Sequence, residues 1–145
     1  MAEVTRTVLV GHSAQRMYEL VDGVERYPEF LPWCSGAEMM RQGADQARAT
    51  LHITYRGVKQ SFTTDNTTIP GSEIHMTLVD GPFRSLDGTW RFLPLAAEAC
   101  KIEFTLHYEF SSGLLDKLVG PVFGHIAGTM VDAFLARAEK LYGST

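Results

Sequence analysis

Apolar and polar residues alternate, then follow helical spacing, and then alternate again along this chain. Residues 3–10 alternate, and that pattern predicts a strand. Ser13 can cap the short helix that follows, whose apolar residues recur at helical spacing up to Val21. A second short helix is predicted over residues 24–31, because Pro32 disfavours helix in the residue before it.

Between residues 47 and 110 the period is two, and short turns that contain Gly or Pro interrupt it. Such short turns imply an antiparallel meander, because parallel strands need much longer crossovers. The last strand alternates most clearly, so one of its faces must be buried and the other exposed to water. Residues 94–98 are expected to connect it to the strand before it. The strands are predicted over residues 47–55, 58–68, 73–79, 85–93 and 100–110.

After Gly113 apolar residues recur at steps of three and four up to Tyr142, which predicts one long C-terminal helix. Pro121 should kink this helix or restart it near its first turns, and Gly143 can end it. An antiparallel sheet with one polar face must cover its apolar face, and only this helix is long enough to do so. We therefore predict an α+β fold, a strongly curved antiparallel sheet around one long C-terminal helix, with an apolar pocket near the short helices.

The composition narrows the classes of partner. The 145 residues are the length of one ordinary domain, predicted over residues 1–145. A net charge of −4 argues against bulk electrostatic attraction to DNA or to anionic lipid headgroups. No window reaches the roughly 18 apolar residues that a spanning helix needs, and the first residues do not resemble a signal peptide. We expect a cytoplasmic protein that contacts no DNA and does not insert stably into a membrane.

The sequence holds no pattern typical of a metal or catalytic site. Cys34 and Cys100 lie in no CxxC motif or Cys/His cluster, and the five histidines form no HxH or HExxH motif. His52, His75 and His107 fall on strand positions expected to face solvent. No GxSxG motif or phosphate-binding glycine loop is present, and the carboxylates occur singly. We therefore expect no metal, no cofactor and no catalytic residue.

Three segments of the chain resemble the coenzyme-Q-binding, START-like family, which includes bacterial ribosome association toxins and proteins once labelled oligoketide cyclases or lipid-transport proteins. The most specific segment is residues 21–34, VDGVERYPEFLPWC. The second is residues 81–92, GPFRSLDGTWRF, and the third runs from Val122 to Ala138. The resemblance covers nearly the whole chain. It implies a helix-grip fold of the START or Bet v 1-like kind, with about seven strands and an apolar cavity.

The same resemblance leaves three functions open, because one fold hosts several activities. The first is a carrier or chaperone that binds ubiquinone or a related prenyl lipid and supports respiration. The second is a ribosome association toxin that binds the large ribosomal subunit and blocks subunit joining. The third is a polyketide aromatase/cyclase, which would need an acid or base inside the cavity. We favour the first and expect no enzymatic activity, since the acidic charge weighs against the second and the absent catalytic motif against the third. Ribosomal RNA would be contacted by basic side chains such as Arg26, Arg41, Arg48, Arg56 and Lys59.

Aromatic side chains are the best candidates for contact with a hydrophobic ligand. Residues 27–34 pack three aromatics and two prolines beside the predicted helices. That composition is typical of a semi-rigid cavity mouth with a phenol or indole N–H available to a ligand carbonyl, and equally of a plug that closes the core. Trp90 and Phe104 are the strongest candidates on the strands, since each lies mid-strand opposite the predicted helix. The predicted lining residues are Tyr27, Phe30, Leu31, Trp33, Phe62, Phe83, Trp90, Phe92, Phe104, Tyr108, Phe123 and Met130.

Overall fold

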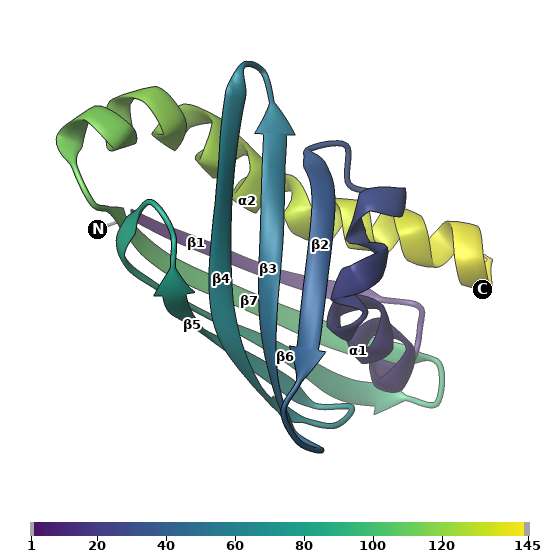
Figure 1. Cartoon of the computed structure of the whole chain (residues 1–145). Helices are drawn as coiled ribbons and strands as arrows, with labels where there is room; N and C mark the ends of the chain where they lie inside the picture. The colour runs from purple at the N-terminus through teal and green to yellow at the C-terminus, as the bar shows by residue number, and fades with distance from the viewer. Residues whose placement is uncertain (1, 144–145) are drawn as a thin grey trace.

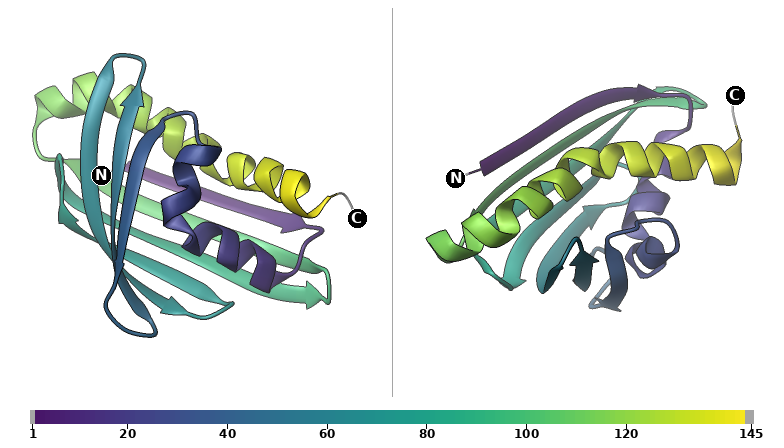
Figure 2. Two further views of the ribbon diagram at one scale, coloured as in Figure 1. Left: turned by 45° about the vertical axis from the view of Figure 1, so that its right-hand side comes forward. Right: turned by 90° about the horizontal axis from the view of Figure 1, so that it is seen from above.

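A seven-stranded antiparallel sheet curves around one long helix in this computed structural model, which describes residues 2–143 (Figure 1). The elements follow in the order β1 (Ala2–Val10), α1 (Ala14–Asp22), the 3₁₀-helix η1 (Val24–Glu29), β2 (Cys34–Arg41), β3 (Gln46–Tyr55), β4 (Val58–Ile69), β5 (Glu73–Asp80), β6 (Phe83–Ala96), β7 (Ala99–Phe110) and α2 (Gly113–Tyr142). The strand order in the sheet is β1-β7-β6-β5-β4-β3-β2. α2 lies along the concave face, and α1 and η1 pack beside its C-terminal half (Figures 1 and 2). The predicted α+β fold is confirmed.

Local chemistry explains where the helices and hairpins begin. The Ser13 hydroxyl accepts a hydrogen bond from the Arg16 N–H at 3.1 Å, so the predicted N-cap of α1 is confirmed. Ser112 caps α2 in the same way. Arg56 and Gly57 both have positive φ, 50° and 82°, in the turn between β3 and β4. Two such residues are what a two-residue hairpin turn requires.

β6 and β2 depart from the predicted strands. β6 continues through Pro94 to Ala96, so residues 94–96 are not a loop. The pairing of β5 with β6 ends at Arg91, and the missing N–H of Pro94 therefore breaks no ladder on that side. β2 was not predicted as a strand; its pairing with β3 shifts register between Cys34 and Gly36, and this irregularity hides the alternation.

The helices depart from the prediction in smaller ways. η1 ends at Glu29 and not at residue 31. α2 is one continuous helix through Pro121, so the proline does not restart it. The axis of α2 changes direction after its first turns (Figure 1).

The core lies between the concave face of the sheet and α2. Along β7 every second residue from Cys100 to Phe110 is buried, and the residues between them are partly exposed. Contrary to the sequence-based expectation, α2 is long and apolar enough to cross a membrane by length and composition. It is nevertheless the core helix of this fold. Its buried residues are Val119, Phe123, Ile126, Ala127, Val131, Phe134 and Ala138.

Candidate functional site

An apolar cavity lies between the inner face of the sheet, α2 and the segment around η1. Most of its lining is hydrophobic, and it receives side chains from β3, β4, β5, β6, β7, α1, η1 and α2. The volume of the cavity is only about 60 Å³. That is room for a few waters, whereas pockets that enclose drug-sized ligands span roughly 300–1,000 Å³. A larger guest therefore requires movement of the walls.

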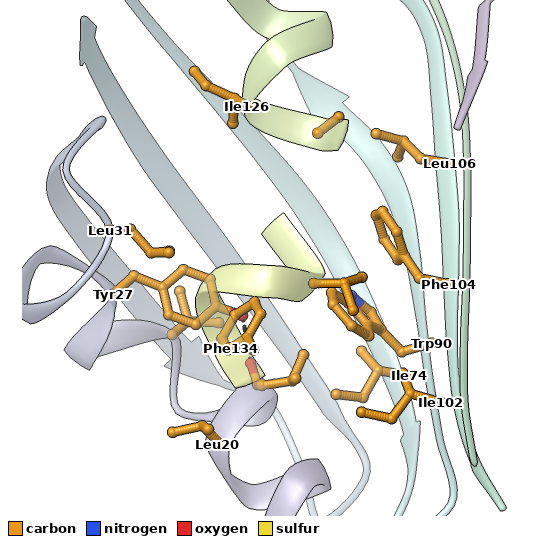
Figure 3. Packing of buried hydrophobic residues seen from close by; sticks show 14 of the residues in the cluster. Leu20, Tyr27, Leu31, Ile74, Trp90, Ile102, Phe104, Leu106, Ile126 and Phe134 are labelled. Atoms are coloured by element: carbon orange, nitrogen blue, oxygen red, sulfur yellow. Dashed lines mark hydrogen bonds between the residues drawn. The ribbon is translucent and has the colours of Figure 1, made fainter. Parts of the chain in front are cut away.

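The structure brings seven of the predicted residues to this cavity. Trp90 and Phe104 form its sheet side, with ring centroids 4.3 Å apart and almost no exposed surface. Figure 3 shows both residues on the sheet, opposite Ile126 and Phe134 of α2. The predicted residues that line the cavity are Tyr27, Trp33, Phe62, Trp90, Phe104, Phe123 and Met130.

The other five predicted residues lie elsewhere in the core, because the same inner face continues past the cavity at both ends. Phe92 stacks beside Trp90 and against Tyr18 of α1. Phe83 packs with Phe110 at the opposite end, near the start of α2. Phe30 lies beside Phe134, with ring centroids 5.5 Å apart. The predicted residues outside the cavity lining are Phe30, Leu31, Phe83, Phe92 and Tyr108.

Tyr27 does not offer its phenol to a ligand, contrary to the expectation for the cavity mouth. Its hydroxyl donates a hydrogen bond to the backbone carbonyl of Val21. Burial raises the pKa of this phenol, so it stays protonated and keeps that bond. The ring lines the cavity, and its polar end holds the end of α1 against η1.

Two polar residues in the lining, Thr64 and Asn66, were not among the predicted site residues. Both lie on the inner face of β4 and are 5% exposed. The Thr64 hydroxyl donates to Asn66 Oδ1 at 2.7 Å. The signal was in the sequence: the period of two that places Phe62 on the inner face places residues 64 and 66 there as well.

The ionisable groups in and near the cavity are either hydrogen-bonded within the chain or buried thiols. Asp22 lines it, and its Oδ2 accepts a hydrogen bond from Arg41 Nη2 at 3.1 Å. Cys34 and Cys100 are buried thiols, and burial raises the pKa of each, which disfavours the nucleophilic thiolate. Among residues 2–143, no group of three or more His, Cys, Asp or Glu side chains is placed to bind a metal ion.

Comparison with known proteins agrees with this architecture. Residues 10–135 match the family described as polyketide cyclase / dehydrase and lipid transport. The chain belongs to this family. The resemblance to START-like proteins seen in the sequence is thereby confirmed. Among solved structures, a START superfamily protein from Mycobacterium smegmatis matches with a TM-score of 0.75 and 23% identity, over 96% of this chain and 98% of that one. The Zhui aromatase/cyclase from Streptomyces matches with a TM-score of 0.82 and 20% identity, over 99% of each chain.

Relatives of this chain carry names of more than one kind. A ribosome association toxin RatA from Vibrio cholerae is 44% identical over 99% of each chain. Another, from Escherichia coli, is 42% identical over 99% of this chain and 91% of that one. The coenzyme Q-binding protein COQ10 homolog B of Xenopus laevis is 28% identical over 97% of this chain and 59% of its own length.

Proposed function

We propose that this chain binds a hydrophobic small molecule in its internal cavity, with ubiquinone or a related prenyl lipid as the favoured guest. It would act as a cytoplasmic carrier or chaperone that supports respiration. The observation that carries the proposal is the apolar, largely enclosed cavity between α2 and the sheet. The coenzyme Q-binding name of one relative gives additional support. Affinity would come from burial of apolar surface, about 25 cal/mol per Å² removed from water.

The small volume of the cavity implies that its walls adapt to the guest. Met76 and Met130 both line it, and methionine side chains are flexible enough to repack around different shapes. Tyr27 and Trp33, on and just after η1, close one side. Outward movement of η1 would widen the cavity. Trp33 would stay joined to the sheet, because its backbone carbonyl accepts a hydrogen bond from the Thr54 N–H of β3 at 3.0 Å.

Tryptophan fluorescence tests the proposal directly. The chain has two tryptophans, and both Trp33 and Trp90 line the cavity. Titration with decylubiquinone should quench their emission to a plateau, whereas free N-acetyltryptophanamide should show only linear collisional quenching. Mass spectrometry of an organic extract of the purified protein should reveal a bound lipid. Linear quenching of the protein up to the solubility limit, together with an extract free of lipid, would rule out the carrier function.

Ribosome association is the second candidate, favoured by the names of relatives that are 42–44% identical over nearly the whole chain. It would use the outer surface and not the cavity, so the two functions are compatible. Of the five basic residues expected to contact RNA, Arg41 and Arg48 are paired with carboxylates. Arg26 of η1, Arg56 and Lys59 are exposed, and no ion pair involves any of the three within residues 2–143. Of these, Arg56 and Lys59 lie together at the β3–β4 turn. That turn is the surface we propose for this contact.

A cyclase activity has less support. The fold match to an aromatase/cyclase at 20% identity concerns architecture alone. Asp22 and Tyr27 are the acidic side chains in the cavity lining, and both polar groups are bonded to other parts of the chain. An Asp22→Asn variant is therefore expected to retain ligand binding.

A further inference from the structure

The inner face of β4 differs from the rest of the cavity wall. Thr64 and Asn66 project from it into a mostly apolar surface, and both are almost fully buried. Burial of an amide away from water lowers stability unless its hydrogen-bonding groups find partners. Thr64 satisfies only part of this requirement, because its hydroxyl donates to Asn66 Oδ1.

The donor side of the Asn66 amide is left over. An asparagine amide has two N–H donors, and the bond from Thr64 turns the oxygen toward that residue. Within residues 2–143 the Asn66 side chain takes part in one hydrogen bond, the one that its Oδ1 accepts from Thr64, and this leaves Nδ2 without an acceptor. Asp22, the carboxylate in the lining, already accepts from Arg41. The unpartnered donor is therefore the Asn66 amide N–H, and a ligand that complements it must bring an acceptor.

The neighbouring strand leaves space beside the pair. Asn66 is opposite Ala47 on β3, and Thr64 is opposite Ala49. These short side chains contrast with Trp90 and the other rings on β6 and β7. On the other side, Met76 and Leu78 of β5 are opposite Asn66 and Thr64, so the short side chains border the polar pair only toward β3.

We infer that Thr64 and Asn66 form the recognition site for a carbonyl oxygen of the bound ligand, with Asn66 Nδ2 as donor and Thr64 as the residue that fixes the amide orientation. This rests on the proposed binding of an apolar ligand and specifies its class: a hydrophobic molecule with a ketone or quinone carbonyl. The carbonyl would lie deep against β4 and not at the Tyr27 hydroxyl, which is engaged with Val21.

Two probes with the same ring skeleton distinguish recognition of the carbonyl from burial of the apolar rings. Menadione, which is 2-methyl-1,4-naphthoquinone, and 2-methylnaphthalene share a methylated fused ring and differ in two carbonyls. By isothermal titration calorimetry, Asn66→Leu should weaken menadione binding roughly three- to tenfold, the range of one net hydrogen bond. Binding of 2-methylnaphthalene should stay within about twofold of wild type, because its burial involves no hydrogen bond. Thr64→Val should shift the menadione affinity in the same direction by less.

Thr68→Val is the matched control. Thr68 lies on the same face of the same strand and is also buried, but it does not line the cavity. Its variant should leave both affinities unchanged. Equal loss of both probes in Asn66→Leu, or no loss of either in a variant shown to be folded by circular dichroism, would overturn the inference and leave apolar binding intact. A wild type that binds neither probe would instead refute the proposed function. If Asn66→Leu does not fold, Thr64→Val is judged by the same two-probe criterion.

Discussion

At the scale of single residues, two phenylalanines packed against Trp90 differ in what lies on the other side of their rings. Phe92 is fully buried and lies against Tyr18, outside the cavity lining. Phe104 is equally buried from solvent, but it lines the cavity. A ring that borders empty space has fewer atoms in contact, so its dispersion contribution is smaller.

This difference predicts unequal costs for the same truncation. Phe92→Ala should lower the free energy of unfolding by about 3–5 kcal/mol, the usual value for a packed aromatic. Phe104→Ala should lower it by at least about 1 kcal/mol less, because part of the ring's surroundings is already void. Urea unfolding of both variants measures this. Saturating decylubiquinone should recover part of the loss in Phe104→Ala by mass action, about 2.7 kcal/mol at a hundredfold excess over Kd. Equal costs without recovery would mean that Phe104 is ordinary core.

At the scale of elements, one arginine of α2 holds η1 in place. Arg137 Nη2 donates to Glu29 Oε1 at 2.9 Å, and the guanidinium lies 5.0 Å from the centre of the Phe30 ring. The Arg137 side chain is only 13% exposed, so water screens this contact less than an ordinary surface pair. Because η1 and the residues after it close one side of the cavity, we expect the Arg137 contact to limit ligand entry.

Arg137→Met should loosen η1 while it keeps much of the apolar packing. Amide hydrogen exchange of residues 24–33 should accelerate several-fold, since local opening there loses an ion pair and a cation–π contact. Quinone association measured by stopped-flow quenching should also become faster. Arg6→Met is the control, because Arg6 makes a similar pair between β1 and Asp132 of α2, away from η1. Exchange that rises equally in both variants, or in neither, would argue against this role.

The elements also show how far the sequence leads. The period of two predicted six of the seven strands, namely β1 and β3 to β7. It did not predict β2, because the register shift of that strand between Cys34 and Gly36 breaks the alternation. Periodicity assigns a residue to a face, and it cannot say which part of that face borders a void. Phe92 and Phe104 are indistinguishable by pattern and separate only through their neighbours in space. The same period places Asn66 on the inner face, but it cannot show that Asn66 Nδ2 lacks an acceptor there.

At the scale of the whole molecule, many charged side chains on the outer face of the sheet form ion pairs with one another. Three of its histidines pair with glutamates, and the hydrogen bond that His107 donates to Glu3 raises the pKa of His107. Arg48 forms a two-bond pair with Asp65 on the neighbouring strand. Within residues 2–143, Arg56 and Lys59 form no ion pair, and both are exposed at the β3–β4 turn. The glutamate partners are Glu38 for His52, Glu73 for His75 and Glu3 for His107.

Ribosome association predicts that this turn, and not the cavity, controls sedimentation. In a sucrose gradient at low salt the protein should migrate with free large subunits, and excess protein should reduce the fraction of joined ribosomes. Binding should weaken as salt rises, because each phosphate contact releases counterions. Replacement of Arg56 and Lys59 by alanine should reduce the slope of log K against log salt by roughly 0.7–0.9 for each contact removed.

Replacement of Arg48 and Arg84, which are paired with Asp65 and Glu109, should change that slope little. Asn66→Leu should sediment like wild type, because the cavity lies inside the fold. Protein that stays at the top of a low-salt gradient, with unchanged ribosome profiles, would eliminate this candidate and leave ligand binding as the function to pursue.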